Sequence, residues 1–110
     1  MRKLAEDFLQ SLAHERRASE HTVRAYRHDL EEFLAFVADR QKRPAEPRDL
    51  EIAMVRGYLA SLFGGNGAST IARKLSSLRS FGAYLVRRGE RADNPAELVA
   101  MPKRPKVLPQ

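Results

Sequence analysis

Residues 69–89 are the segment that most constrains the fold, because their polar and apolar side chains separate at helical spacing. At about 100° of turn per residue the apolar side chains share one side of a helix. They are Ile71, Leu75, Leu78, Gly82, Leu85 and Val86, with Phe81 at the edge. A stripe of this width is buried against other elements. The spacing therefore predicts one long helix, capped by Ser69, that packs on a helical core.

The opposite side of this helix is basic and rich in hydroxyl groups. It carries Arg73, Ser76, Ser77, Ser80, Tyr84 and Arg87, with Lys74, Arg79 and Arg88 on its shoulders, and the next carboxylate is Glu90. A solvated helix usually pairs acids with bases three or four residues apart, and this helix lacks such pairs. Because serine side chains are short, the surface between the cations allows a phosphate backbone to approach the helix closely. The pattern favours a helix that faces nucleic acid, and a coincidental run of cations on an exposed helix is the alternative.

Charge and composition point to the same class of partner. The chain of 110 residues has 20 Lys and Arg against 14 Asp and Glu, a net charge of +6. A polyanion is the natural partner of such a protein. The absence of cysteine excludes disulfides and thiolate metal sites and fits a cytoplasmic location. No apolar run reaches membrane-spanning length, and the first ten residues do not form a signal peptide, so we expect no membrane partner.

Three more helices are predicted, over residues 2–17, 20–40 and 51–63, which makes the fold all-α. Their apolar stripes are Leu4, Phe8, Leu9 and Leu12; then Val23, Tyr26, Leu30, Phe33, Leu34 and Val37; then Ile52, Val55, Leu59 and Leu62. Ser19 is expected to cap the second helix. The glycine-rich turn at 64–67 separates the third helix from the fourth.

The second helix carries a further candidate contact surface. Arg24, Arg27 and His28 lie in its N-terminal half, where the helix dipole disfavours cations. Ser19 and Thr22 add hydroxyls that can donate to phosphate. The arrangement indicates that this half of the helix meets an anion. Neutral drift is the alternative, because cations near the N-terminus of a helix cost little stability.

The C-terminal part differs in composition from the rest. Asn94-Pro95 opens a possible short helical turn, and the last ten residues carry three prolines and three cations. Such a segment cannot form a helix and is typical of a semi-rigid linker. We therefore expect a helical domain at 1–93 and a linker at 94–110 that leads to an absent domain.

No catalytic residue, metal site or cofactor site is expected. His14, His21 and His28 have no second pair of ligands at metal spacing. No tyrosine is predicted to lie beside a cationic cluster that would activate it. The turn at 64–67 lacks the Lys-Ser/Thr of a phosphate-binding loop.

Three motifs then resemble one protein family. The first matches the S-x-x-T-x-x-x-Y-x-x-D-L-x-x-F pattern in the N-terminal core-binding domain of tyrosine recombinases, and its residues here are Ser19, Thr22, Tyr26, Asp29, Leu30 and Phe33. Residues 70–81 resemble the same family's T-I-x-R-x-L-S-x-L-R-x-F helix. The pairs Asn94-Pro95, Pro102-Lys103 and Leu108-Pro109 resemble the run that leads into its catalytic domain. Within the family the chain is most similar to the Xer chromosome-resolution recombinases, of the XerC type.

The resemblance implies a four-helix, SAM-like orthogonal bundle that forms half of a clamp around a double-stranded DNA recombination site. It also implies partner recombinase subunits, in a homo- or hetero-tetramer on DNA, and a separate catalytic domain. The positions carried over as candidate DNA contacts are Ser19, Thr22, Arg24, Ala25, His28, Ser69, Thr70, Arg73, Lys74, Ser77 and Ser80. The core-binding domain of a phage or integron integrase, and a basic helical module that binds an acidic protein, are the alternatives.

Gly82 departs from the family pattern, which often has an aromatic residue there. Glycine costs about 1 kcal/mol of helix propensity relative to alanine and fills no volume. Its place in the apolar stripe predicts that another helix crosses very closely or that the core is thin.

Overall fold

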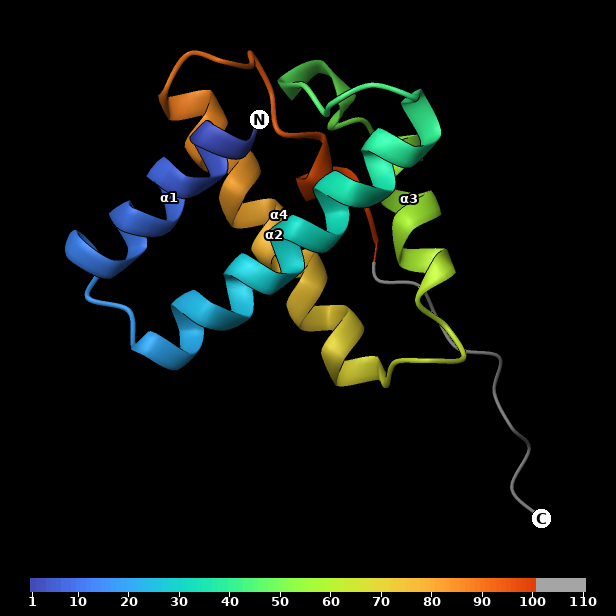
Figure 1. Cartoon of the computed structure of the whole chain (residues 1–110), viewed down its shortest axis with the longest axis horizontal. Helices are drawn as coiled ribbons and strands as arrows, with labels where there is room; N and C mark the ends of the chain where they lie inside the picture. Colours follow the sequence, from blue (N-terminus) through green and yellow to red (C-terminus); the bar gives the residue numbers. More distant parts are fainter. Residues whose placement is uncertain (101–110) are drawn as a thin grey trace.

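The computed structural model describes residues 1–100, which fold into four α-helices and two short 3₁₀ turns (Figure 1). In chain order they are α1 (Arg2–His14), α2 (Glu20–Gln41), η1 (Pro47–Asp49), α3 (Ile52–Ser61), α4 (Ala68–Arg87) and η2 (Pro95–Leu98). The described residues contain no β-strand, so the prediction of an all-α fold with four helices is confirmed. The proline-rich segment 101–110 lies outside the described residues.

The two longest helices, α2 and α4, cross near the middle of the molecule (Figure 1). Their N-terminal ends point to the lower edge of the view and diverge from the crossing. Helix α1 packs against both α2 and α4, while α3 contacts α2 and η2. The crossing therefore places the N-terminal half of α2 and the N-terminal half of α4 on the same side of the domain.

The helix ends follow local backbone chemistry. Ser19 caps α2 as predicted, since its side chain accepts a hydrogen bond from the Thr22 backbone N–H at 3.1 Å. Helix α4 begins at Ala68 with Gly67 at the cap position, two residues before the predicted cap, so the prediction that Ser69 caps it is wrong. Helix α4 is followed by Gly89, whose φ of +77° is accessible to glycine at little cost.

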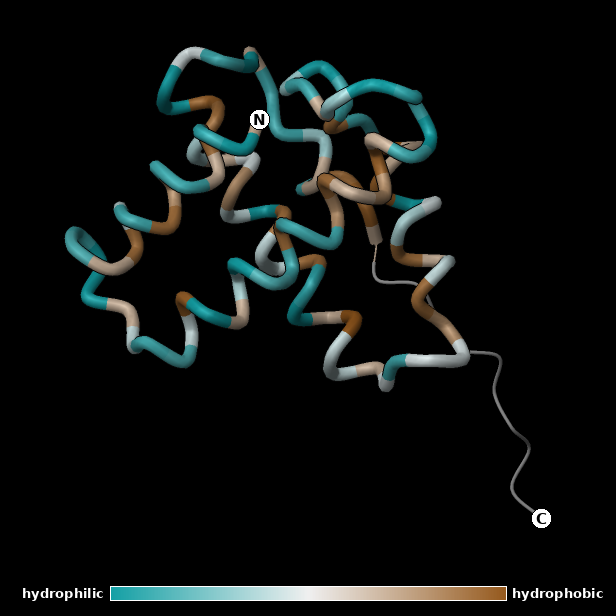
Figure 2. The backbone as a smooth tube through the Cα atoms, viewed as in Figure 1, coloured by the Kyte–Doolittle hydropathy of each residue, from teal (hydrophilic) through white to brown (hydrophobic). Residues whose placement is uncertain are grey.

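The core is built around aromatic contacts between helices. Phe8 of α1 packs against Phe81 and Tyr84 of α4, with ring centroids 5.6 Å and 5.5 Å apart. Phe33 of α2 meets Tyr58 of α3 edge to face at 5.3 Å. Hydrophobic positions recur once per turn along the helices (Figure 2). Most of the predicted stripe residues are buried; Leu4, Val23, Tyr26 and Ile52 are half-buried, and Val86 is exposed.

The segment after α4 packs onto the domain instead of leaving it. Ala96 and Val99 are buried, and the Arg79 guanidinium donates to the backbone oxygens of both, at 3.2 Å and 2.6 Å. The prediction that a linker starts at Asn94 is therefore wrong, because residues 94–99 complete the core. Arg79, which suited either a phosphate or an internal partner in sequence, anchors this segment.

Asn94 explains the glycine in the middle of α4. A Cβ atom at position 82 would lie 1.9 Å from the Asn94 Oδ1, far inside van der Waals contact. The Asn94 Nδ2 donates to the Arg79 backbone oxygen at 2.9 Å, which fixes the side chain over Gly82. The close approach predicted at Gly82 is thus made by a side chain and not by a crossing helix.

Within residues 1–100, none of the helices has the length and apolar character needed to cross a membrane.

Candidate nucleic-acid interface

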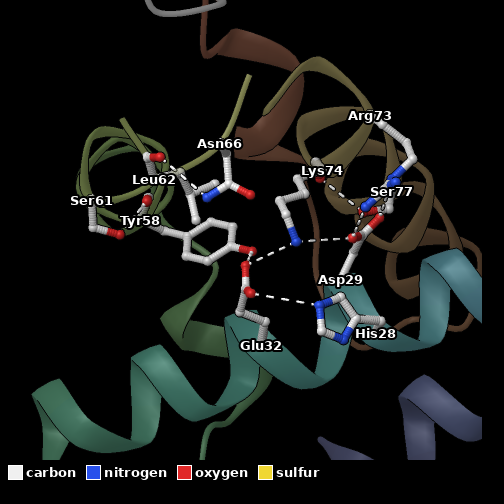
Figure 3. A network of polar contacts seen from close by, with 10 residues as sticks. All are labelled: His28, Asp29, Glu32, Tyr58, Ser61, Leu62, Asn66, Arg73, Lys74 and Ser77. Carbon is white, nitrogen blue, oxygen red and sulfur yellow. Dashed lines mark hydrogen bonds and ion pairs between the residues drawn. The ribbon is translucent and has the colours of Figure 1, made fainter. Parts of the chain in front are cut away.

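A buried carboxylate marks the point where α2 and α4 cross. Asp29 of α2 is 1% exposed and accepts two hydrogen bonds from Arg73 of α4, at 3.1 Å from Nε and 2.7 Å from Nη2. The Lys74 Nζ donates to the same carboxylate at 3.1 Å (Figure 3). One acid of α2 thus holds two successive cations of α4.

Lys74 also joins α3 to this crossing. Its Nζ lies 3.0 Å from a Glu32 oxygen, and the Tyr58 hydroxyl donates to the same carboxylate at 2.5 Å (Figure 3). Lys74 is only 2% exposed, so two carboxylates compensate its buried charge. We call Asp29, Glu32, Tyr58, Arg73 and Lys74 the crossing network. It ties α2, α3 and α4 together with directional bonds.

The contacts of the crossing network shift the pKa values of Glu32 and Tyr58. Burial would raise the pKa of Glu32, but hydrogen bonds from Tyr58 and Lys74 outweigh it and lower that pKa. Burial, and then the Glu32 carboxylate, raise the pKa of the Tyr58 phenol. Tyr58 does lie near a cation, since Tyr58 and Lys74 share the Glu32 carboxylate. The raised pKa nevertheless makes this phenol a donor and a poor nucleophile.

The candidate residues of α2 lie mostly on the surface. Ser19, Thr22, Arg24 and His28 are exposed, and Ala25 is half-buried. His28 is 68% exposed, with its Nε2 3.7 Å from a Glu32 oxygen. Arg27 instead faces α1, where its Nη2 donates to a Glu6 oxygen at 2.9 Å and hydrogen bonding lowers the pKa of Glu6. Arg27 therefore belongs to the packing of α1 on α2.

The candidate residues of α4 divide into two groups. Ser69 and Arg73 are exposed, while Thr70 and Ser80 are half-buried. Lys74 and Ser77 are buried, and the Ser77 hydroxyl donates to the Lys74 backbone oxygen at 2.8 Å. Burial excludes direct contact of Lys74 and Ser77 with DNA in this structure, which corrects their assignment. Both fall on the side of α4 that faces α2, where Asp29 and Glu32 supply acceptors for the lysine.

The N-terminal halves of α2 and α4, on the same side of the domain (Figure 1), carry several exposed polar residues, and we call seven of them the open end. They are Ser19, Thr22, Arg24 and His28 of α2 and Ser69, Arg73 and Ser76 of α4. Residues 68–89, which comprise α4 and the turn after it, contain no Asp or Glu. The open end can therefore offer cations and hydroxyl donors to an anionic ligand.

Comparison with known proteins identifies the family of this chain. The profile of the family described as phage integrase, N-terminal SAM-like domain, matches residues 5–89. The chain belongs to this family.

Three relatives illustrate the similarity of this SAM-like domain to recombinases. The protein named tyrosine recombinase XerC of Pelobacter propionicus is 44% identical over 95 residues, which cover 86% of this chain and 32% of the relative. Those of Rhizobium meliloti and Mycobacterium sp. strain JLS are 45% identical over 107 residues and 39% over 110, covering 94% and 99% of this chain and 34% and 36% of the relatives. The resemblance to tyrosine recombinases is confirmed. The SAM-like domain spans about a third of the length of these relatives. No solved structure was found to match it.

At the other end of α4 the SAM-like domain uses three of its cations internally. Arg79 binds residues 96 and 99, Arg88 donates to the Tyr84 hydroxyl at 2.5 Å, and Arg91 donates to the Pro47 oxygen at 2.8 Å. We call the C-terminal half of α4, residues 88–99 and η1 the closed end. Tyr84, assigned to the polar face from sequence, is buried there against Phe8.

Sequence reasoning missed the role of Asp29 and Glu32. Asp29 falls in register with Tyr26 and Phe33 on the stripe that faces the core, and an acid there is rarely buried without a cation. The position of Asp29 on the apolar stripe was therefore a signal in the sequence that this acid has a buried cationic partner. Glu32 gives no such signal, because its partners come from α3 and α4 and only the fold brings them together.

His14, His21 and His28 are all exposed, and the described part of the chain holds no cluster of three or more side chains suited to a metal ion.

Proposed function

We propose that this SAM-like domain binds duplex DNA through the open end, as the DNA-binding N-terminal part of a Xer-type site-specific tyrosine recombinase. The observation that carries the proposal is the crossing of α2 and α4, which puts the N-terminal halves of both helices, with the exposed residues that they carry, on one side of the domain (Figure 1). The family match and the names of the relatives support it.

Each helix contributes two kinds of contact. Ser19 and Thr22 lie in the first turn of α2, and Ser69 lies in the first turn of α4, where unpaired backbone N–H groups and the helix dipole favour phosphate. Arg24, His28 and Arg73 lie one or two turns further along and face the groove between the strands. The helix starts therefore fix the position of the domain on the backbone, and the residues behind them meet base edges.

In the whole protein this domain acts as one half of a DNA clamp in the cytoplasm. Strand cleavage and rejoining belong to a catalytic domain outside this chain. Other recombinase subunits, in a tetramer on the recombination site, are the protein partners. A DNA substrate that traps cleaved strands should stay intact with this chain alone, and nicking by the pure protein would contradict this division of labour.

Salt-dependent binding tests the proposal. A domain that neutralises about four phosphates should lose roughly 100-fold in affinity between 50 mM and 200 mM salt. We expect the double variant Arg24→Ala and Arg73→Ala to weaken binding to every duplex, measured by fluorescence anisotropy with a labelled duplex.

A matched control keeps the net charge of that variant but removes cations elsewhere. Arg48 and Arg87 are exposed and lie away from the open end. Their double replacement by alanine should leave affinity close to that of the unmodified chain. Equal losses in both double variants would show that only net charge matters. Salt-independent binding, or no binding at low salt, would contradict the proposal.

A further inference from the structure

We propose that Arg73 reads a guanine in the major groove, with its guanidinium held in the reading orientation by Asp29. This inference rests on the proposed function and adds to it one specificity-determining residue and one positioning residue.

The geometry of the Arg73–Asp29 pair leaves one edge of the guanidinium available. Asp29 accepts from Nε and Nη2, the side edge of the plane, at 3.1 Å and 2.7 Å. The end edge, with one N–H of Nη1 and the second N–H of Nη2, has no partner among residues 1–100. The side chain is 42% exposed, and guanine readout requires this unpaired edge to be the part that faces solvent at the open end. Two parallel N–H groups match the O6 and N7 acceptors of guanine.

The anchor of this arrangement is rigid. Asp29 is buried, and Lys74 donates to it independently of Arg73 at 3.1 Å. The carboxylate therefore cannot rotate freely to follow a moving arginine. A guanidinium fixed before binding loses less side-chain freedom when it meets its ligand, and its direction selects one base position.

The local charge balance favours a base over a phosphate. The cations Arg73 and Lys74 face the carboxylates Asp29 and Glu32 at salt-bridge distance, so the cluster is neutral when His28 is neutral. A phosphate at the free edge of Arg73 would gain little net attraction because Asp29 lies directly behind it. Guanine offers two acceptors without a net charge. Arg24 differs from Arg73 because it is exposed and has no acidic partner within residues 1–100, so no carboxylate offsets its charge.

Selection from a random duplex library, followed by atom replacement, tests the inference. The 110-residue chain is used to enrich preferred duplexes, and each guanine of an enriched duplex is then replaced by 7-deazaguanine, which lacks the N7 acceptor. We expect replacement at one guanine to lower affinity by about 5- to 100-fold, the range of one bidentate contact. Binding is measured at constant salt because phosphate contacts depend on it.

Three variants assign that effect to the pair. Arg73→Ala should remove the response to 7-deazaguanine at this position, and Arg73→Lys should do so too, because lysine keeps the charge but lacks the planar fork. Asp29→Asn should reduce the preference for guanine while salt-dependent binding to unrelated duplexes remains. The control Arg87→Ala should respond as the unmodified chain does. Circular dichroism establishes that each variant is folded.

Two results would overturn the inference and leave the proposed function standing. The unmodified chain could bind duplexes with no response to any 7-deazaguanine. Alternatively, Arg73→Ala could weaken binding to all duplexes equally and keep the response, which would make Arg73 a phosphate contact. If the unmodified chain bound no duplex at low salt, the proposed function would fail first.

Discussion

The open end and the closed end both carry cations, and they differ in how many of these cations find an acceptor inside the domain. At the closed end Arg79, Arg88 and Arg91 each donate to an acceptor inside the domain. At the open end Arg24 is exposed, the Arg73 side chain is 42% exposed, and Ser19, Thr22 and Ser69 lie on the surface. The difference lies in the acceptors that the fold supplies.

This contrast separates the two sources of positive charge in a basic domain. Cations that hydrogen-bond to acceptors inside the domain hold its segments together, and those hydrogen-bonding groups are not available to a ligand. Cations without an internal acceptor remain for a polyanion. Net charge alone therefore overstates the binding surface, and the position of buried carboxylates such as Asp29 defines it better.

The largest effect on stability is expected at Lys74, whose side chain is buried although the preceding residue, Arg73, is exposed. Lys74→Ala should lower the free energy of unfolding by about 3 to 5 kcal/mol, because Asp29 and Glu32 would keep buried charges with one partner fewer. Urea unfolding monitored by circular dichroism measures the change. A loss below about 1 kcal/mol would show that the crossing network does not hold the helices together.

A smaller loss of stability is expected for a substitution at Gly82, which lies under the Asn94 side chain at the closed end. Gly82→Ala should destabilise the domain by up to about 3 kcal/mol, because the new methyl group would displace Asn94 from its bond to the Arg79 oxygen. Thermal unfolding of the single variant measures this.

The variant that combines Gly82→Ala with Asn94→Gly removes the obstruction. In the Asn94→Gly background the alanine should be neutral or stabilising by up to about 1 kcal/mol through helix propensity. If alanine destabilised both backgrounds equally, contact with Asn94 would not be the reason for the glycine.

The closed end should also show an acid-sensitive contact at Asp49. Hydrogen bonds from Arg43, at 2.7 Å and 2.8 Å, hold the pKa of Asp49 below its ordinary value. A lowered folded pKa gives stability that is present above the unfolded pKa, near 4, and is lost as pH falls through the folded pKa. Asp49→Asn should therefore cost about 1.5 kcal/mol at neutral pH and progressively less toward pH 2, in urea titrations at several pH values. A cost that does not change with pH would contradict this.

The smallest effect on stability is expected at Arg73. Arg73→Ala should lower the free energy of unfolding by less than about 1 kcal/mol, because the side chain is 42% exposed and Lys74 still binds Asp29. The same variant should lose DNA binding far more than its stability change explains. A loss comparable to that of Lys74→Ala would erase the distinction between the two neighbouring residues.

Much of this fold is predictable from sequence because it depends on local patterns. Helical periodicity placed all four helices, and the Ser19 cap followed from its position before an apolar stripe. The C-terminal boundary was predicted wrongly, because composition cannot show that Asn94 fits over Gly82 or that Arg79 binds residues 96 and 99.

The site was predictable only in outline. The sequence indicates that the N-terminal halves of α2 and α4 are polar and basic, which gave Ser19, Arg24, His28 and Arg73. It does not indicate which of two adjacent cations turns inward, since that depends on where Asp29 and Glu32 lie after folding. Lys74 and Ser77 were therefore assigned to the surface although both are buried.

Mapping the DNA contact by nuclear magnetic resonance tests the central claim most directly. Amide resonances of the isotopically labelled chain are followed while a short duplex is added at low salt. We expect the largest shifts at residues 19–28 and 68–76, with little change at residues 79–99. Shifts concentrated at the closed end, or spread evenly over all exposed cations, would contradict the assignment of DNA binding to the open end.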